Sequence, residues 1–215
     1  MPTRKLVIEL LSETTFGHGQ PTAGQVDIEV QFDRYGCPYI GGKRIHGLLL
    51  DCWLTMGEQA PLELHEAAAE MLGEPGMLLS RPLLRTSRAR LSGDIRMAVK
   101  AAVTRKNNPV SVNAVKEAFS TIRVQTAEDR QSGAPAEGTL RFRRALRKGL
   151  KFEADITLSS KAARPDDCWK CLALCCLALR RGGTARTRGA GKLRCTLDGD
   201  WAGTVRAAGL EEGAQ

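Results

Sequence analysis

A run of two glycines and two cations is the first group of residues whose types could bind a phosphate. Gly41, Gly42, Lys43 and Arg44 stand where an apolar spacing typical of a helix begins. Cations in a first helical turn oppose the helix dipole, at about 0.3–1 kcal/mol each, so helix stability does not explain them. Phosphate binding explains them, because free backbone amides at a helix start and neighbouring cations together bind phosphate. The alternative is that both side chains are merely solvated.

A second cationic segment lies near the end of the chain, in LALRRGGTARTRGAGKLRC. It has no acidic residue, and its cations are Arg180, Arg181, Arg186, Arg188, Lys192 and Arg194. Glycines that let a backbone approach closely lie between them: Gly182, Gly183, Gly189 and Gly191. Like charges at this density repel unless a polyanion neutralises them. Because aromatic residues are only 5% of the chain, we expect backbone contacts to dominate over base stacking.

Single acidic and imidazole side chains are further candidates. Asp27 projects from the polar face of an alternating segment, where a carboxylate beside a phosphate backbone could hold a divalent ion. A solvated side chain is the alternative for a lone Asp. His18, inside FGHG, and His46, just after the cation pair, are placed to touch RNA. The three histidines are too scattered to form a metal site.

The seven cysteines indicate free thiols rather than disulfides. Their number is odd, and the start of the chain lacks a signal-peptide pattern, so we expect a reducing cytoplasm. Cys168, Cys171 and Cys175 share one helical face by spacing, which would allow three thiolates to face a metal. A zinc site needs a fourth ligand, and no second CxxC exists. We therefore predict buried thiols and no metal site there.

The charge balance agrees with a polyanionic partner. Lys and Arg total 32 against 24 Asp and Glu, a net charge of +8, and small proteins this basic often bind nucleic acid. A merely solvated surface is the alternative. No apolar run approaches the ~20 residues that cross a bilayer, so we expect a soluble protein without a membrane partner.

Periodicity predicts the elements that position these residues. Residues 6–11 read as a first strand, 26–33 as a second with a turn at DRYG, and 150–156 as a core strand. An amphipathic helix begins near Ile45, and a second one follows until Gly73. A nearly all-apolar helix, CWKCLALCCLALRR, is expected to start at an Asp166 or Asp167 cap and to lead into a last strand.

The order of these elements predicts an α+β fold with a ferredoxin-like (RRM-like) core. We expect one domain, 1–215, whose core is 1–76 and 150–202. The segment 77–149 is expected to be an insertion with one or two helical pieces and a long hairpin. A frayed tail is expected over 203–215.

Three stretches in this order resemble the repeat-associated mysterious protein (RAMP) superfamily, the guide-RNA-binding subunits of CRISPR effector complexes. They are FGHG, GQVDIEVQFDRYGCPYIGGKRIHGLLLD and LALRRGGTARTRGAGKLRC. A fourth stretch, TAEDRQSGAPAEGTLRFRRALRKGLKFEADI, resembles the thumb hairpin and following strand of type III members. Glu128, Asp129 and Arg130 are the thumb residues that this resemblance implies.

The resemblance implies a type III backbone subunit that binds CRISPR RNA and assembles with target RNA, other effector subunits and copies of itself. It also implies that Asp27, with Mg²⁺ or Mn²⁺, supports cleavage of the target RNA by attack of the neighbouring ribose 2′-hydroxyl. Lys43 and Arg44 then face guide-RNA phosphates.

Three other functions stay open from the sequence. The KRIHG form also resembles the cap subunit, which binds the 5′ handle of the guide and need not cleave RNA. Gly41 replaces the family's usual Pro, and His46 its usual Lys. A guide-processing endoribonuclease of the same superfamily is another alternative, and a general basic RNA-binding protein is the third.

Overall fold

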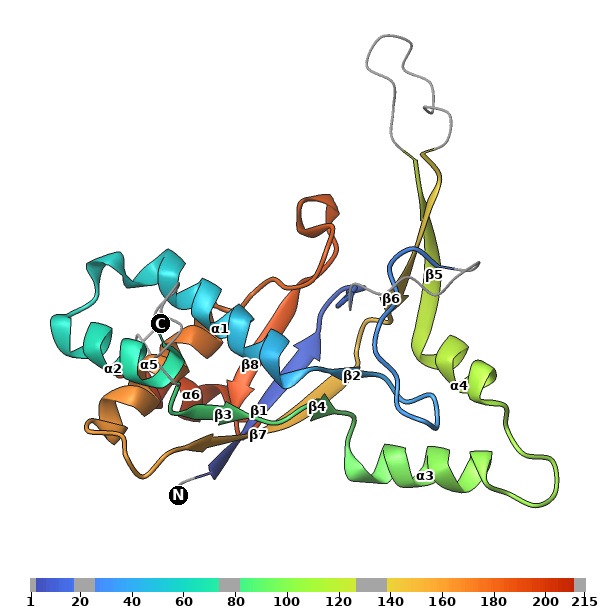
Figure 1. Ribbon diagram of the computed structural model, residues 1–215, viewed down its shortest axis with the longest axis horizontal. Coiled ribbons are helices and arrows are strands. Elements are labelled where there is room, and N and C mark those ends of the chain that lie inside the picture. The colour runs from blue at the N-terminus through green and yellow to red at the C-terminus, as the bar shows by residue number, and fades with distance from the viewer. Residues whose placement is uncertain (1–2, 18–25, 74–81, 127–138, 211–215) are drawn as a thin grey trace, which may run out of the picture.

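A computed structural model describes residues 3–17, 26–73, 82–126 and 139–210. Its central sheet is antiparallel at every strand pair, with the order β2-β4-β7-β1-β8 and with β3 also paired to β7 (Figure 1). The strands are β1 (Thr3–Leu10), β2 (Tyr39–Ile40), β3 (Leu84–Thr86), β4 (Ala89–Arg90), β7 (Lys151–Leu158) and β8 (Leu193–Leu197).

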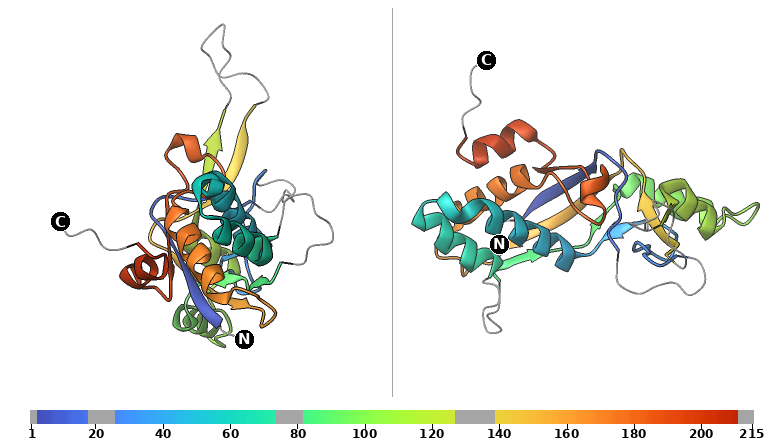
Figure 2. Two further views of the ribbon diagram at one scale, coloured as in Figure 1. Left: turned by 90° about the vertical axis from the view of Figure 1, so that its left-hand side faces the viewer. Right: turned by 90° about the horizontal axis from the view of Figure 1, so that it is seen from above.

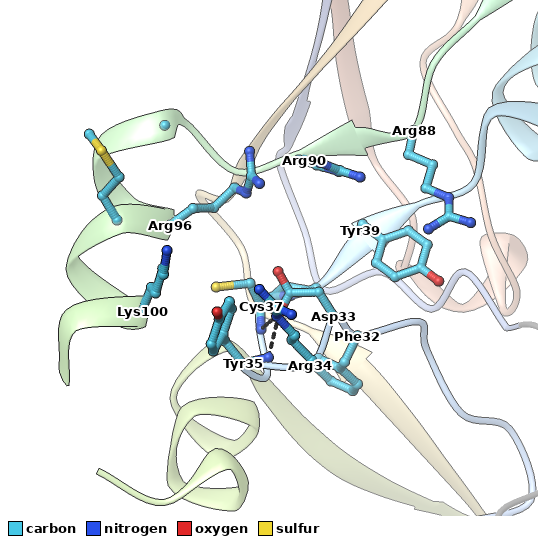
Figure 3. Close-up of a pocket in the computed structure, with 13 residues that line it drawn as sticks. Phe32, Asp33, Arg34, Tyr35, Cys37, Tyr39, Arg88, Arg90, Arg96 and Lys100 are labelled. Carbon is cyan, nitrogen blue, oxygen red and sulfur yellow. Dashed lines mark hydrogen bonds between the residues drawn. The ribbon is translucent and has the colours of Figure 1, made fainter. Parts of the chain in front are cut away.

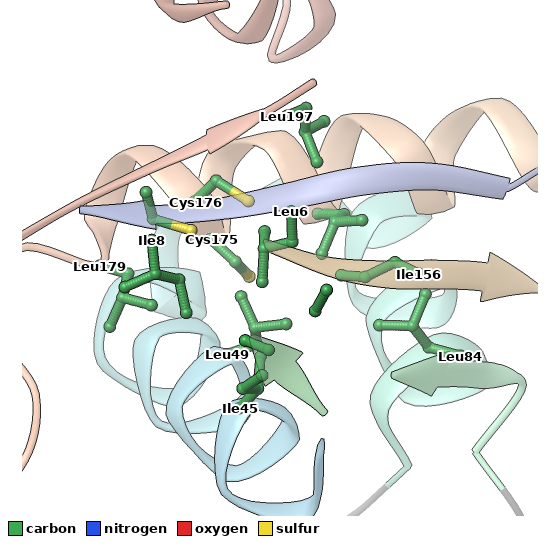
Figure 4. Close-up of a cluster of buried hydrophobic side chains, with 14 of the residues drawn as sticks. Leu6, Ile8, Ile45, Leu49, Leu84, Ile156, Cys175, Cys176, Leu179 and Leu197 are labelled. Carbon is green, nitrogen blue, oxygen red and sulfur yellow. The ribbon is translucent and has the colours of Figure 1, made fainter. Parts of the chain in front are cut away.

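Helices cover one face of this sheet (Figure 2). They are α1 (Gly42–Met56), the short η1 (Gly57–Gln59), α2 (Leu62–Leu72) and α5 (Pro165–Ala178). Alternate residues of β1 and β7 are fully buried beneath them, because a strand directs every second side chain to one face. Figure 4 shows Leu6 and Ile8 from β1 meeting Ile45 and Leu49 from α1.

The core follows the ferredoxin-like order. Four strands lie side by side as β8-β1-β7-β3. Along the chain, α1 and α2 connect β1 to β3, and α5 connects β7 to β8. This is the split βαβ arrangement that the element order predicts, so the predicted α+β class is confirmed.

The long insertion between β3 and β7 carries its own elements. After β4 come α3 (Gly93–Val103) and α4 (Val112–Phe119), then strands β5 (Ser120–Gln125) and β6 (Arg141–Leu146). Strands β5 and β6 form a separate two-stranded sheet that projects from the body (Figure 1). The predicted hairpin is therefore present, while Glu128, Asp129 and Arg130 lie outside the described residues.

The cysteine face of α5 lies in the core. Cys168, Cys171 and Cys175 are fully buried, and the Cys168 thiol donates a weak bond to the Ala67 carbonyl oxygen at 3.7 Å. Burial raises the pKa of Cys168 to about 11, so this thiol is protonated at neutral pH. Within the described residues no group of three His, Cys, Asp or Glu side chains could hold a metal ion.

Three local predictions are wrong in detail. The α5 helix begins at Pro165 with Arg164 as its N-cap, so Asp166 and Asp167 lie in the first turn instead of capping it. The cause is the fixed φ of proline, which suits the first helical position.

The predicted strand over residues 26–33 is irregular. Its bridges go to three different segments, at Gly17–Val30, Ile28–Arg143 and Phe32–Pro38, so no single continuous ladder forms. A strand needs one partner that runs beside it, and no single segment among the described residues does so here.

The predicted tail is partly helical. Trp201–Ala207 form α6, which packs against α5 and β8. Thr204 and Ala208 are buried there, and the Thr204 hydroxyl accepts a hydrogen bond from the Leu197 amide at 2.9 Å. The described helices include none long and apolar enough to cross a membrane.

Candidate nucleic-acid interface

The first turn of α1 presents its cations to solvent. Gly41 caps the helix with extended backbone (φ −64°, ψ 139°), without a side-chain capping bond and without an acidic residue in the first turn. Lys43 and Arg44 are both exposed. An open pocket of about 790 Å³, here called the α1 groove, lies beside this turn; its walls include Gln31, Tyr39, Lys43, Arg44, Asp51 and Arg88.

Two candidate residues in this turn also make internal contacts. One Arg44 guanidinium nitrogen, Nη2, donates to the Gly17 carbonyl oxygen. The His46 Nε2 lies 2.9 Å from the Leu72 carbonyl oxygen, and its ring is half-buried against the end of α2. An RNA contact by His46 therefore stays a prediction, and RNA would have to compete with the Leu72 carbonyl oxygen for this nitrogen.

The glycines of the α1 turn have a packing role. A Cβ on Gly42 would lie 2.3 Å from the Thr86 carbonyl oxygen of β3, closer than any side chain tolerates. A Cβ on Gly41 would lie 3.1 Å from the Gln31 side chain. Gly42 is thus required by the approach of α1 to β3, whether or not a ligand binds.

The second cationic segment, residues 181–192, is here called the glycine loop. Its two ends are joined by a hydrogen bond from the Gly182 amide to the Gly191 carbonyl oxygen, 2.9 Å, and its tip is a 3₁₀ turn at Arg186–Arg188. Gly191 has φ +74°, and a Cβ there would lie 2.2 Å from the Gly182 carbonyl oxygen. Only glycine permits this approach of one strand of the loop to the other.

The cations of the glycine loop lie at the surface. Arg181, Arg186, Arg188 and Lys192 are exposed, and none has an ion pair within 4.0 Å in the described part of the chain. One Arg181 nitrogen donates to the Arg186 carbonyl oxygen, which shapes the tip. Four cations without an ion-pair partner on one loop give it the charge that a multivalent anion would neutralise.

Residues 13–17 join the glycine loop to the α1 turn. The Thr184 amide donates to the Thr15 carbonyl oxygen at 3.0 Å, and a Cβ on Gly182 would touch Phe16 and Leu48, the latter in α1. At the other end of the segment, Gly17 accepts the bond from Arg44 described above. The two predicted loops, far apart in sequence, therefore lie on the same side of the molecule.

The same segment holds the base of the hairpin. Thr14 exchanges two backbone hydrogen bonds with Leu146 of β6, at 3.1 and 2.8 Å. Arg123 of β5 donates two bonds to the Glu13 carboxylate, at 2.8 and 2.6 Å, and these bonds lower the pKa of Glu13. In Figure 1 the hairpin and the glycine loop both project from the same side of the sheet body.

Asp27 lies beside strand β6 of the hairpin, at Phe142. Its amide donates to the Phe142 carbonyl oxygen at 2.8 Å, and its Oδ2 accepts from the Phe142 amide at 2.7 Å. The residue is exposed. The first bond fixes the backbone of Asp27 and the second holds its carboxylate, so Asp27 is a positioned group rather than a freely solvated one.

The described residues fit a divalent ion at Asp27 only in part. Asp27 offers one carboxylate, in which Oδ2 accepts the bond from Phe142 and Oδ1 is the second oxygen. Mg²⁺ commonly uses one or two carboxylates and completes its shell with water and substrate phosphate. Such an ion would therefore need the RNA backbone itself as ligand. His18, the nearest other candidate in sequence, lies outside the described residues.

Sequence reasoning missed the residues that hold this interface together. Glu13, Arg123 and Arg143 connect residues 13–17 to the hairpin, and the Arg143 Nη1 donates to the Thr15 hydroxyl at 3.0 Å. In the sequence these residues show only as an isolated acidic residue and as parts of basic segments. Such patterns do not reveal which residues pair across more than 100 positions.

Comparisons with known proteins give the fold a precedent. No protein-family model matches the sequence, and no curated protein matches it. A chain of a type III-B Cmr-beta complex bound to cognate target RNA is similar in structure, with TM-score 0.66 and 12% identity over 92% of this chain and 98% of that one. The same complex in its apo state gives TM-score 0.65 at 12% identity, over the same shares of both chains.

A chain of a type IV-B CRISPR complex is also similar. Its TM-score is 0.57 at 12% identity, and the match covers 93% of this chain and 92% of that one. At this identity the likeness shows a shared fold, and the match spans nearly the whole of each chain.

Proposed function

We propose that this chain is an RNA-binding subunit of a CRISPR effector complex, which holds guide RNA between the first turn of α1 and the glycine loop. The single observation that carries the proposal is that residues 13–17 bring these two cationic segments together beside the projecting hairpin. The fold shared with subunits of type III-B and type IV-B complexes, one of them bound to target RNA, supports it.

Direct binding of RNA tests this proposal. Fluorescence anisotropy of a labelled single-stranded RNA should show binding in dilute buffer and a steep loss of affinity with salt, because each neutralised phosphate releases counterions. Lys43→Glu combined with Arg188→Glu removes one exposed cation from each segment and should weaken binding about 100-fold, the scale expected when several phosphates are no longer neutralised.

A matched charge reversal controls for net charge. Arg105 and Lys106 follow α3 and are exposed, so Arg105→Glu with Lys106→Glu makes the same change of charge elsewhere. This control should bind RNA within about twofold of the unmodified chain, as surface substitutions far from a site do. Equal losses in both variants would reduce the interface to nonspecific charge attraction and contradict the proposal.

Within this proposal, Asp27 supports cleavage of the target RNA with Mg²⁺ or Mn²⁺. The observation that favours it is the exposed carboxylate held by the Phe142 amide of strand β6. In the assembled complex, Asp27→Asn should leave guide binding intact and abolish cleavage of the target. Unchanged cleavage would remove the catalytic role, and a single copy of the chain per complex by native mass spectrometry would favour a cap subunit.

A further inference from the structure

A second cationic pocket lies outside the α1 groove, between α3, β4 and the turn over residues 32–39 (Figure 3). It is here called the α3 pocket, and its volume is about 580 Å³. Five cations line it: Arg34, Arg88, Arg90, Arg96 and Lys100. Nothing in the proposed grip on guide RNA uses this pocket.

The positive charge of the α3 pocket is uncompensated. The acidic side chain in its wall is Asp33, whose Oδ1 accepts hydrogen bonds from the amides of Tyr35 and Cys37 at 2.9 and 3.0 Å. This carboxylate therefore shapes the turn. Among the described residues, none of the five cations has an ion-pair partner within 4.0 Å.

One of these cations carries a buried donor without a partner. The Nε of Arg96 is inaccessible to solvent, and no described group accepts its hydrogen. Buried donors are nearly always bonded, and one left unbonded carries a desolvation penalty. The side chain of Arg96 lines the pocket and is only half-buried, so a small rotation would bring this donor to an anionic oxygen bound there.

Aromatic rings give the pocket a second kind of interaction. The Arg88 guanidinium lies 5.1 Å from the ring centre of Tyr39, and that of Arg34 lies 4.8 Å from the ring centre of Tyr35. Both rings are half-buried. Planar guanidinium and tyrosine groups are the platforms on which unpaired bases stack, whereas an acidic peptide needs only the charges.

The α3 pocket adjoins the α1 groove. Tyr39 and Arg88 line both, so a strand held at the first turn of α1 meets the α3 pocket next. We propose that the α3 pocket binds a nucleotide of single-stranded RNA that continues from the α1 groove, with its phosphate on the cations and its base on the tyrosine–arginine platform. This inference rests on the proposed function, RNA binding at the α1 groove.

Binding as a function of RNA length tests the proposal. The probes are fluorescein-labelled oligouridines of increasing length, and the variant is Arg34→Glu with Lys100→Glu, both exposed in the unmodified chain. The variant should bind the shortest oligomers normally and the longer ones at least tenfold more weakly. Its affinity should also depend less on salt, by a slope of about 0.7 for each phosphate that the pocket no longer neutralises.

The control is again Arg105→Glu with Lys106→Glu, which should match the unmodified chain at every length. A photocrosslink from 5-iodouridine in the longer oligomers should map to Tyr35 or Tyr39. Equal affinities of the pocket variant and the control at all lengths, with no such crosslink, would overturn the inference.

Two further outcomes separate the possible failures. If the unmodified chain binds no RNA, the proposed function fails together with the α3 pocket. If it binds RNA through Lys43 and Arg188 while the pocket variant changes nothing, only the α3 pocket fails. Binding of a labelled oligoglutamate peptide that the pocket variant alone abolishes, without an effect on RNA, would also overturn the inference, because the pocket would then serve an acidic protein.

Discussion

The base of the hairpin and the glycine loop are both rich in arginine, but they use it differently. At the base, Arg144 is 8% exposed and donates from Nε to both oxygens of Glu29, at 2.9 and 3.1 Å, and from Nη1 to the Ser120 hydroxyl. In the glycine loop, Arg186 and Arg188 are exposed and, among the described residues, have no acidic partner.

This difference separates two roles for the same residue type. A buried cation must be paired, because desolvation of an unpaired charge is costly, so Arg144 and Glu29 hold the hairpin in place. An exposed cation without a partner contributes little to stability and is available for a ligand. Substitutions should therefore affect stability at the base of the hairpin and RNA binding at the glycine loop.

The largest expected effect is on stability. Arg144→Ala leaves Glu29 buried and unpaired and should lower the free energy of unfolding by about 3–5 kcal/mol, as measured by urea denaturation. Arg147→Ala is the control, because Arg147 is exposed and donates one bond, to the Glu117 carbonyl oxygen at 3.2 Å. The control should change stability by about 0.5 kcal/mol or less. Similar decreases in both variants would contradict a structural role for the Glu29 pair.

The next effect concerns the glycines of the loop. Gly191→Ala combines a positive φ, which disfavours side chains by about 1–2 kcal/mol, with a clash against the Gly182 carbonyl oxygen, so a destabilisation of about 2–4 kcal/mol is expected. Gly189 is the matched control, with φ +78° and open space around its missing Cβ. Gly189→Ala should lower the free energy of unfolding only by the part due to positive φ. Equal decreases for both variants in urea denaturation would mean that the approach of Gly191 to the Gly182 carbonyl oxygen is unimportant.

The loop cations should give a smaller effect, and on binding alone. Arg188→Ala with Lys192→Ala should weaken RNA binding about tenfold, equivalent to about 1.4 kcal/mol. The slope of log affinity against log salt should flatten by about 0.7 for each phosphate that the loop no longer neutralises. The melting temperature should stay the same, because neither side chain has an ion-pair partner in the described chain. A fall in melting temperature with unchanged RNA binding would show that the loop cations stabilise the fold and do not bind RNA.

The smallest effect is a pH dependence at the base of the hairpin. The hydrogen bonds from Arg123 hold the pKa of Glu13 below its ordinary value of 4.5. The ion pair therefore stabilises fully above about pH 4.5, and this stabilisation disappears as the pH falls through the lower pKa of the folded protein. Amide-exchange protection of β5 should drop over that range in the unmodified chain, and Glu13→Gln should remove this part of the drop. An identical drop in Glu13→Gln would show that another group causes it.

The sequence predicted the parts of the fold that depend on local periodicity. Alternating apolar residues in β1 and β7 and the helical spacing of Ile45, Leu49 and Trp53 each identify a buried face without reference to other segments. The same reasoning was wrong over residues 26–33, because apolar residues alternate there in the sequence while the bridge partners come from three segments. Periodicity reports which side is buried, and it does not report what lies beside the strand.

The candidate site divides in a similar way. The sequence identified Lys43 and the cations of the glycine loop, because unpaired charge is visible in composition. It interpreted Gly42 and Gly191 as access for a ligand, whereas each is required by a carbonyl oxygen of the protein itself. The α3 pocket also escaped it, because Arg34 and Lys100 lie far apart in the chain and are gathered only when α3 lies beside the turn over residues 32–39.

By itself the sequence determined the α+β elements, the excess of positive charge and the exposure of that charge on two glycine-containing segments. Those properties follow from neighbours in the chain, through side-chain period and local charge density. Only the tertiary structure decided that residues 13–17 bring the two segments together, and which arginines are neutralised by distant acids. Such pairings depend on distances in space, which folding sets and sequence spacing does not.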